Sequence, residues 1–272
     1  MNQVIGSLDK MKTSCPEGGG LVEYSLVMGG QPVLDLNPLI GKQISWSFNN
    51  KIECVHCGVP IRKAFGQGSC WPCFNNLACN DMCIMKPETC HYAKGTCREP
   101  QWGESNCMRQ HALYLARSSG VKIGITRGGN HLTRWADQGA SEAGIIGLFP
   151  TRLDVGLAEK AISSSGISDR TGWQKMLKNE VVDTPFEPII EKVREVLSDD
   201  QKQYLLDSPE FINLEYPHQQ WPSKVKSLKL DKVPVFTGTL VAIKGQYLIF
   251  DSNEVLNIRS HSGYNIALSW ED

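Results

Sequence analysis

The chain has 272 residues and a net charge of −1, and 41% of its residues are hydrophobic and 21% charged, as in an ordinary globular protein. This length suffices for one large domain or two smaller ones. No apolar run approaches the roughly 18 residues that a membrane-spanning helix needs. The segment Met1–Gly6 has neither the basic nor the apolar region of a secretory signal. We therefore expect a soluble, cytoplasmic protein with no membrane partner.

The first part of the chain, residues 1–53, has the pattern of β-strands. Val22–Val27 and Gln43–Phe48 alternate apolar and polar side chains with a period of two. Glycine runs at 18–20 and 29–30 provide turns around them. We interpret residues 1–53 as an N-terminal β segment.

Residues 54–108 contain nine of the ten cysteines, and only Cys15 lies outside. Thiols stay reduced in the cytoplasm, so a cluster of this kind indicates metal binding. The first four form two CxxC pairs that are twelve residues apart, the spacing of a structural zinc site. The predicted zinc ligands of this first site are Cys54, Cys57, Cys70 and Cys73.

The remaining cysteines of this segment have irregular spacing and leave alternatives open. A second zinc would take four ligands from a larger set, and the spacing does not choose among them. The candidates are Cys79, Cys83, Cys90, Cys97, Cys107, His91 and His111. The alternative for these residues is a few buried thiols beside a single zinc site. For the first site, the alternative is a redox-active pair formed by Cys70 and Cys73. Because all-cysteine sites have no open coordination position, we expect these sites to be structural.

Residues 109–206 have the pattern of an α/β core. His111–Ala116 and Val121–Thr126 predict two strands of a hairpin. A helix is expected to open at Leu132–Trp135. A second helix is expected over Val155–Ile162, with Asp154 as its cap.

The rest of the chain continues this mixed pattern. Apolar side chains at helical spacing predict a helix over 186–206, with Pro188 in its first turn. Residues 207–232 are expected to form an extended connector. Residues 233–272 return to β, so that 207–272 is a connector with a C-terminal β segment. Whether the two terminal β segments pair in one sheet is left open. The expected fold class is α+β, with a small zinc module before the α/β core.

The order of residues in the core resembles that of the GIY-YIG nuclease superfamily. That superfamily has a Tyr on its first strand, an Ile-Gly pair on its second, an Arg on the next helix and a Glu on a later helix. The matching residues are Tyr114, Ile123-Gly124, Arg134 and Glu159. Lys122 replaces the second family Tyr, as in a branch with K-I-G at this place. The cysteine-rich segment before the core resembles an uncharacterised, zinc-carrying branch, and the resemblance covers residues 111–180.

The resemblance implies roles for four residues in phosphodiester cleavage. Tyr114 would act as the base or orient the attacking water, and Arg134 would bind the scissile phosphate, whose oxygens fit its guanidinium. Glu159 would hold Mg²⁺ or Mn²⁺. Lys122 would contact phosphate or transfer a proton, if burial and Arg134 lower its pKa.

The charge distribution agrees with an anionic partner. Five basic residues and no acidic ones lie between Ser105 and Ala136, whereas the region from Glu180 onward is acidic. Local positive charge of this kind favours nucleic acid, either DNA or RNA. Arg117, Arg127 and His131 are further candidate contacts to nucleic acid. The sequence leaves two function classes open, a metal-dependent endonuclease and a non-catalytic module that binds nucleic acid or a ribonucleoprotein.

Overall fold

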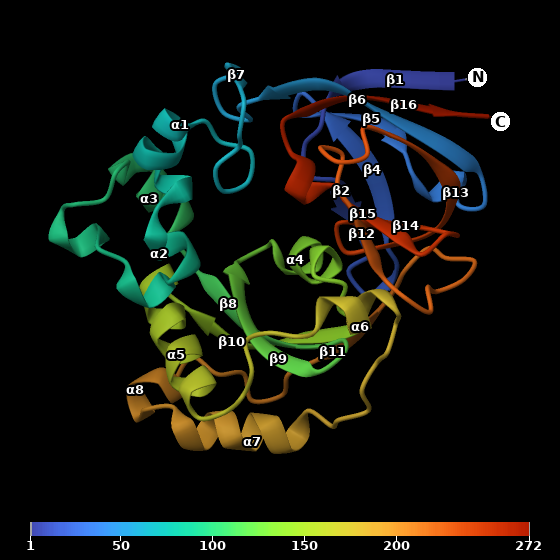
Figure 1. Cartoon of the computed structure of the whole chain (residues 1–272). Coiled ribbons are helices and arrows are strands. Elements are labelled where there is room, and N and C mark those ends of the chain that lie inside the picture. Colours follow the sequence, from blue (N-terminus) through green and yellow to red (C-terminus); the bar gives the residue numbers. More distant parts are fainter. Residues whose placement is uncertain (1, 272) are drawn as a thin grey trace.

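The computed structural model of the chain describes residues 2–271. Within this range the strands form sheets of eight, five and three strands, combined with short helices (Figure 1). The protein is thus of mixed α and β structure, as the sequence predicts. No helix in residues 2–271 has both the length and the apolar character that crossing a membrane requires.

The largest sheet joins the two ends of the chain. β1 pairs antiparallel with β16, in a register that runs from Asn2 opposite Trp270 to Ser7 opposite Asn265. The strand order is β1-β16-β6-β13-β14-β15-β12, with β7 paired to β6. The two terminal β segments therefore form one sheet, and both ends of the chain emerge on the same side of the molecule (Figure 1). The bounds are β1 Asn2–Ser7, β6 Gln43–Glu53, β7 Pro60–Ile61, β12 Lys226–Leu228, β13 Val235–Lys244, β14 Tyr247–Phe250, β15 Glu254–Asn257 and β16 Tyr264–Trp270.

The five-stranded sheet has the order β3-β11-β10-β8-β9. β8 and β9 form the predicted antiparallel hairpin, with Tyr114 opposite Gly124. β11 lies in the range expected as an extended connector, yet it pairs with both β10 and β3. The sheet thus takes strands from outside residues 109–206, and β9 is at its edge. The bounds are β3 Gly20–Leu21, β8 His111–Arg117, β9 Val121–Arg127, β10 Glu142–Phe149 and β11 Phe211–Glu215.

A three-stranded sheet completes the β structure. It has the order β2-β4-β5, with β2 at Lys12–Ser14, β4 at Glu23–Met28 and β5 at Gln31–Asp35. Its apolar side chains join those of the largest sheet in one core, which contains the fully buried Trp46 and Tyr24.

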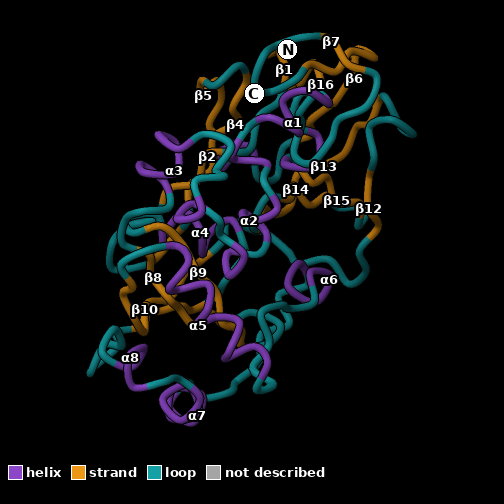
Figure 2. Tube along the Cα trace, turned by 90° about the vertical axis from the view of Figure 1, so that its left-hand side faces the viewer, coloured by secondary structure: helices purple, strands orange, loops and turns teal. Residues whose placement is uncertain are grey.

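Helices lie on both faces of the five-stranded sheet (Figure 2). Leu113 and Leu115 face a core shared with α5 and α7, whereas Tyr114 faces the core shared with α4. The side chains of β8 alternate between these cores because neighbouring residues of a strand point to opposite faces. The bounds are α4 His131–Asp137, α5 Arg152–Ser164, α6 Trp173–Leu177, α7 Glu187–Val196 and α8 Asp199–Lys202.

Two helix boundaries differ from the expected ones. α5 begins three residues earlier, because the Thr151 hydroxyl accepts a hydrogen bond from the backbone N–H of Asp154. Thr151 and not Asp154 is therefore the cap. The expected helix over 186–206 is divided into α7 and α8, because Leu197 and Ser198 adopt extended backbone conformations between them.

The cysteine-rich segment consists of short helical turns and loops. Its helices are α1 Trp71–Asn76, α2 Met82–Met85 and α3 Pro100–Asn106. Short 3-10 turns η2 Ala78–Asn80, η3 Pro87–Thr89 and η4 Tyr92–Lys94 lie between them. η3 packs against α5, so the segment lies beside the α/β core and α1 lies near β7 (Figure 1).

Candidate functional site

The first candidate site is the four-cysteine cluster. Cys54 follows β6, and Cys70 and Cys73 lie at the beginning of α1. A turn with Gly58 in the left-handed region (φ +73°) returns the chain after Cys57. The four sulfurs all lie within 4.8 Å of one another, and the Sγ atoms of Cys57 and Cys70 are 3.7 Å apart. Four thiolates about 2.3 Å from a zinc ion would be separated by about 3.8 Å.

The backbone around this cluster also fits metal thiolates. The backbone N–H of Cys70 donates to Cys54 Sγ at 3.1 Å, and that of Cys73 donates to Cys70 Sγ at 3.4 Å. Burial raises the pKa of Cys54, but hydrogen bonds from the backbone N–H groups of Cys70, Cys57 and His56 outweigh it and bring the pKa to about 6. These four residues could hold a metal such as zinc, in agreement with the sequence prediction.

The later cysteines divide into two groups. Four of them line one small cavity together with His91, whereas Cys79 lies outside its lining. His111 is also outside it. It is fully buried at the start of β8, where its Nδ1 lies 2.7 Å from the carbonyl oxygen of Arg109. The cysteines at the cavity are Cys83, Cys90, Cys97 and Cys107.

A second candidate site is built around Tyr114 of β8. Its side chain is fully buried and crosses Gly124 of β9, where a Cβ atom would lie 2.5 Å from the Tyr114 hydroxyl. The hydroxyl donates to Oε1 of Gln138 at 2.8 Å, and the ring packs edge-on against Trp135. The glycine of the Ile-Gly pair is therefore needed to accommodate this tyrosine.

Lys122, Arg134 and Glu159 come together with Tyr114, each from a different element. Burial and the Arg134 guanidinium lower the pKa of Lys122 to about 8. Burial and the nearby Asp169 carboxyl raise the pKa of Glu159 to about 7. Burial raises the pKa of Tyr114, although Arg134 opposes this rise. The four side chains from β8, β9, α4 and α5 thus form one electrostatically coupled group, the Tyr114 cluster.

The Tyr114 cluster has the chemical groups for proton transfer beside an anion. Burial brings the pKa values of both Glu159 and Lys122 closer to neutral pH, which suits both groups to proton exchange. The guanidinium of Arg134 can bind two oxygens of a phosphate. Tyr114 stays protonated, which suits a hydrogen-bond donor better than a base.

The expected nucleic-acid contacts are spread over the β8–β9 hairpin and α4. Arg117 and Arg127 lie at opposite ends of the β8–β9 hairpin. Arg117 is ion-paired with Glu142 at 2.9 Å and stacks on Phe186. Arg127 contacts Asn106 at the end of the cysteine-rich segment.

His131 lies beside the Tyr114 cluster. It opens α4, where its ring packs against Trp135 with centroids 4.9 Å apart. Burial lowers its pKa.

Sequence reasoning missed two carboxyl groups that lie near Glu159 of the Tyr114 cluster. Asp169, in the loop after α5, and Glu88, in η3, both raise the pKa of Glu159. Neither belongs to a periodic or spaced motif, so only the folded chain brings them to Glu159.

Comparison with known protein families assigns the chain to a family. A family model described as "Protein of unknown function (DUF2797)" matches residues 41–266. The chain belongs to this family. No curated protein and no solved structure matches it.

The family match corrects the assignment to the GIY-YIG nucleases, because the model that matches is not one of that superfamily. The resemblance depended on four short sequence motifs made of common residue types. Local packing accounts for part of the pattern, since Gly124 is needed wherever Tyr114 crosses the neighbouring strand.

Proposed function

We propose that this protein binds nucleic acid and hydrolyses phosphodiester bonds at the Tyr114 cluster. One observation carries the proposal: Lys122, Arg134 and Glu159 come from β9, α4 and α5 into one electrostatically coupled group, in which burial lowers the pKa of Lys122 and raises that of Glu159. Strongly shifted pKa values of this kind are more common at functional sites than elsewhere. The cations favour an anionic substrate, and the proton-exchanging groups favour catalysis.

Each member of the cluster has a proposed role in hydrolysis. Neutral Lys122 accepts a proton from the attacking water, whose oxygen forms a bond to phosphorus while the P–O bond to the leaving group breaks. Arg134 binds the phosphate oxygens and stabilises their increased negative charge. The buried Tyr114 positions Arg134 and does not touch the substrate.

A divalent cation would be held by the carboxyl groups of Glu159 and Asp169. These two lie close enough for Asp169 to raise the pKa of Glu159, and oxygen ligands suit Mg²⁺ or Mn²⁺. A bound cation would favour the ionised form of Glu159 and release its proton. It would supply charge stabilisation at the phosphate.

The cysteine-rich segment has a structural role in this proposal. Zinc in the four-cysteine cluster would hold the turn after β6 against α1. The second zinc expected from the sequence would lie between α2 and α3. Neither site would have an open coordination position for catalysis.

Non-catalytic binding of nucleic acid is the second candidate function. The observation that favours it is the complete burial of Tyr114, which removes its hydroxyl from any substrate. In that case the cluster would position Arg134 and Lys122 as phosphate contacts only.

A nuclease assay separates the two functions. We expect the purified protein to cleave mixed DNA and RNA substrates with Mg²⁺ or Mn²⁺, and Glu159→Gln to abolish cleavage. Glu191→Gln, on the exposed side of α7, removes a carboxylate far from any proposed role and should cleave normally. No cleavage by the wild-type protein, with binding retained, would refute the enzyme and leave the binding module.

Binding is tested by fluorescence anisotropy at several salt concentrations. We expect Arg134→Ala to weaken binding and to reduce its salt dependence, because one phosphate contact is lost. Lys192→Ala, which removes an exposed charge of α7, is the control and should bind as the wild type. Binding that does not respond to salt, or no binding, would refute both functions.

A further inference from the structure

The strongest unassigned feature is the small cavity between α2, η4 and α3. Its lining includes Cys83, Cys90, Cys97 and Cys107. The cavity has a volume of about 10 Å³, which is room for about one water molecule or one ion. We propose that these four thiolates bind a second zinc ion, and that Cys79 takes no part in it.

The segment around this cavity has no apolar core of its own. None of residues 78–107, all of which the structure describes, belongs to any of the three hydrophobic clusters. Its helices span four to seven residues, too short to be stable by themselves. Met82 and Met85 point to solvent, with exposed fractions of 63% and 78%. A bound metal supplies the folding free energy that apolar burial does not.

The charge around the cavity suits a zinc ion with four thiolates. Such a centre has a net charge of about −2. The half-buried Arg152 guanidinium lies within electrostatic reach of the thiols of Cys107, Cys83 and Cys90, and its Nε has no hydrogen-bond partner within the described residues. A neighbouring cation offsets the negative charge of the four thiolates.

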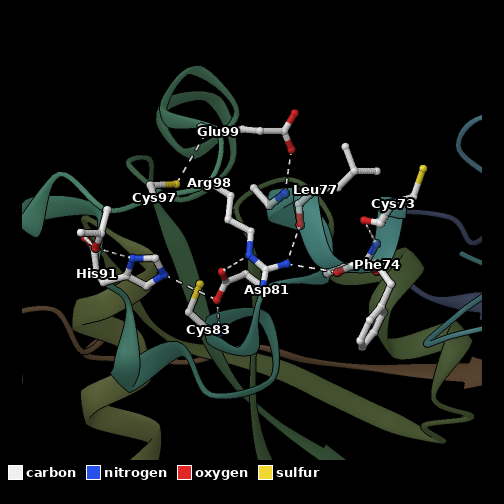
Figure 3. A network of polar contacts seen from close by, with 12 residues as sticks. Cys73, Phe74, Leu77, Asp81, Cys83, His91, Cys97, Arg98 and Glu99 are labelled. Carbon is white, nitrogen blue, oxygen red and sulfur yellow. Dashed lines mark hydrogen bonds and ion pairs between the residues drawn. The ribbon is translucent and has the colours of Figure 1, made fainter. Parts of the chain in front are cut away.

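A different ligand set is less favourable. Asp81, Cys83 and His91 offer ligand atoms within 4.8 Å of one another, whereas among the described residues no three of the four cavity cysteines do. The four sulfurs would therefore have to move together on binding the ion. However, a carboxylate oxygen of Asp81 is 2.7 Å from Nε of Arg98, and another accepts a hydrogen bond from the backbone N–H of Cys83 (Figure 3). Asp81 is thus already occupied as the partner of Arg98 and the cap of α2. A guanidinium so close to a ligand would also repel the metal ion.

The second site would support the helix that carries Glu159. Arg152, in the first turn of α5, makes two hydrogen bonds to the cysteine-rich segment. Its Nη2 donates to the carbonyl oxygen of Ile84 at 2.8 Å, and its backbone N–H donates to the carbonyl oxygen of Cys107 at 2.9 Å. A Cβ at Gly156 would lie 2.8 Å from the backbone nitrogen of Glu88. The first two turns of α5 are therefore held by the segment that the metal orders. This consequence for activity rests on the proposed function, whereas the metal site itself does not.

The test is the zinc content of the purified full-length protein, measured by elemental analysis and native mass spectrometry. We expect two zinc ions per chain in the wild type and in Cys79→Ser, and one in Cys97→Ser. His91→Ala should retain two and Cys90→Ser only one. One zinc in the wild type would overturn the proposal. Loss of zinc from His91→Ala, with two retained by Cys90→Ser, would overturn the four-thiolate assignment.

Cobalt substitution of the wild-type protein keeps the test decisive if a variant fails to fold. Each Co²⁺ bound by four thiolates adds sulfur-to-metal charge-transfer absorption in the near ultraviolet. We expect this absorption to increase about equally with the first and second equivalents, because both sites have four sulfur ligands. A second equivalent that adds none would overturn the proposal. Neither readout depends on nuclease activity, so failure of the proposed function leaves this result intact.

Discussion

The charge of Glu159 should lower the stability of the folded protein at neutral pH. The pKa of this carboxyl is raised from 4.5 to about 7, chiefly by burial and then by Asp169. As pH rises, the unfolded chain loses this proton first, so the free energy of unfolding falls between about pH 4.5 and 7 and then levels off. The shift corresponds to a loss of about 3 kcal/mol at pH 8.

Glu159→Gln keeps the shape of the side chain and removes its charge. We expect this variant to exceed the wild type in free energy of unfolding by about 3 kcal/mol at pH 8 and by about 2 kcal/mol at pH 6. Urea unfolding followed by tryptophan fluorescence, in zinc-containing buffer, measures both values. Glu191→Gln, on an exposed helix face, should differ from the wild type by less than about 0.5 kcal/mol.

Two results for Glu159→Gln would contradict the expected cost of the Glu159 charge. A Glu159→Gln variant less stable than the wild type at pH 8 would mean that Lys122 and Arg134 stabilise the carboxylate more than burial opposes it. Equal stability of the two proteins at both pH values would mean that the carboxyl is well hydrated. If the same variant gains stability and loses cleavage, the charge is retained for function at the expense of stability.

Three further predictions concern the Tyr114 cluster and the zinc site. Gly124→Ala should lower the free energy of unfolding by about 1–3 kcal/mol, because the new Cβ would lie 2.5 Å from the Tyr114 hydroxyl. Gly120→Ala, with no heavy atom nearer than 3.6 Å, is the control, and equal urea midpoints for the two variants would contradict the clash. Lys122→Met should raise the free energy of unfolding by about 3 kcal/mol at pH 7 but by less than about 1 kcal/mol at pH 10. The pKa of Lys122 is about 8 in the folded protein and 10.5 in the unfolded chain, so the free-energy cost of burying its charge disappears as the pH rises from 8 to 10.5. An equal gain in stability at both pH values would contradict this prediction. Removal of zinc with a chelator should unfold residues 54–108, and a circular dichroism spectrum that does not change would contradict this.

Features that depend on near neighbours could be predicted from the sequence. The β8–β9 hairpin was predictable because its two apolar strands and its turn lie within 17 residues, from His111 to Arg127. The first metal site was predictable because each CxxC pair brings two sulfurs together by local geometry. Thr151 was missed as the cap of α5 because Thr and Asp accept the same hydrogen bond, and only the backbone conformation distinguishes them.

Features that depend on distant segments were decided by the tertiary structure. The sequence determined by itself that a cysteine-rich segment able to hold a metal precedes a hairpin with Tyr114 and Lys122, since these are local patterns. It did not determine that β1 pairs with β16, that Cys79 lies apart from the second cysteine group, or that Asp169 approaches Glu159. Pairing over long separations depends on which apolar faces pack together, and the pKa of a buried group depends on all its neighbours in space. The acid–base character of the Tyr114 cluster is therefore a property of the fold and not of any motif in the chain.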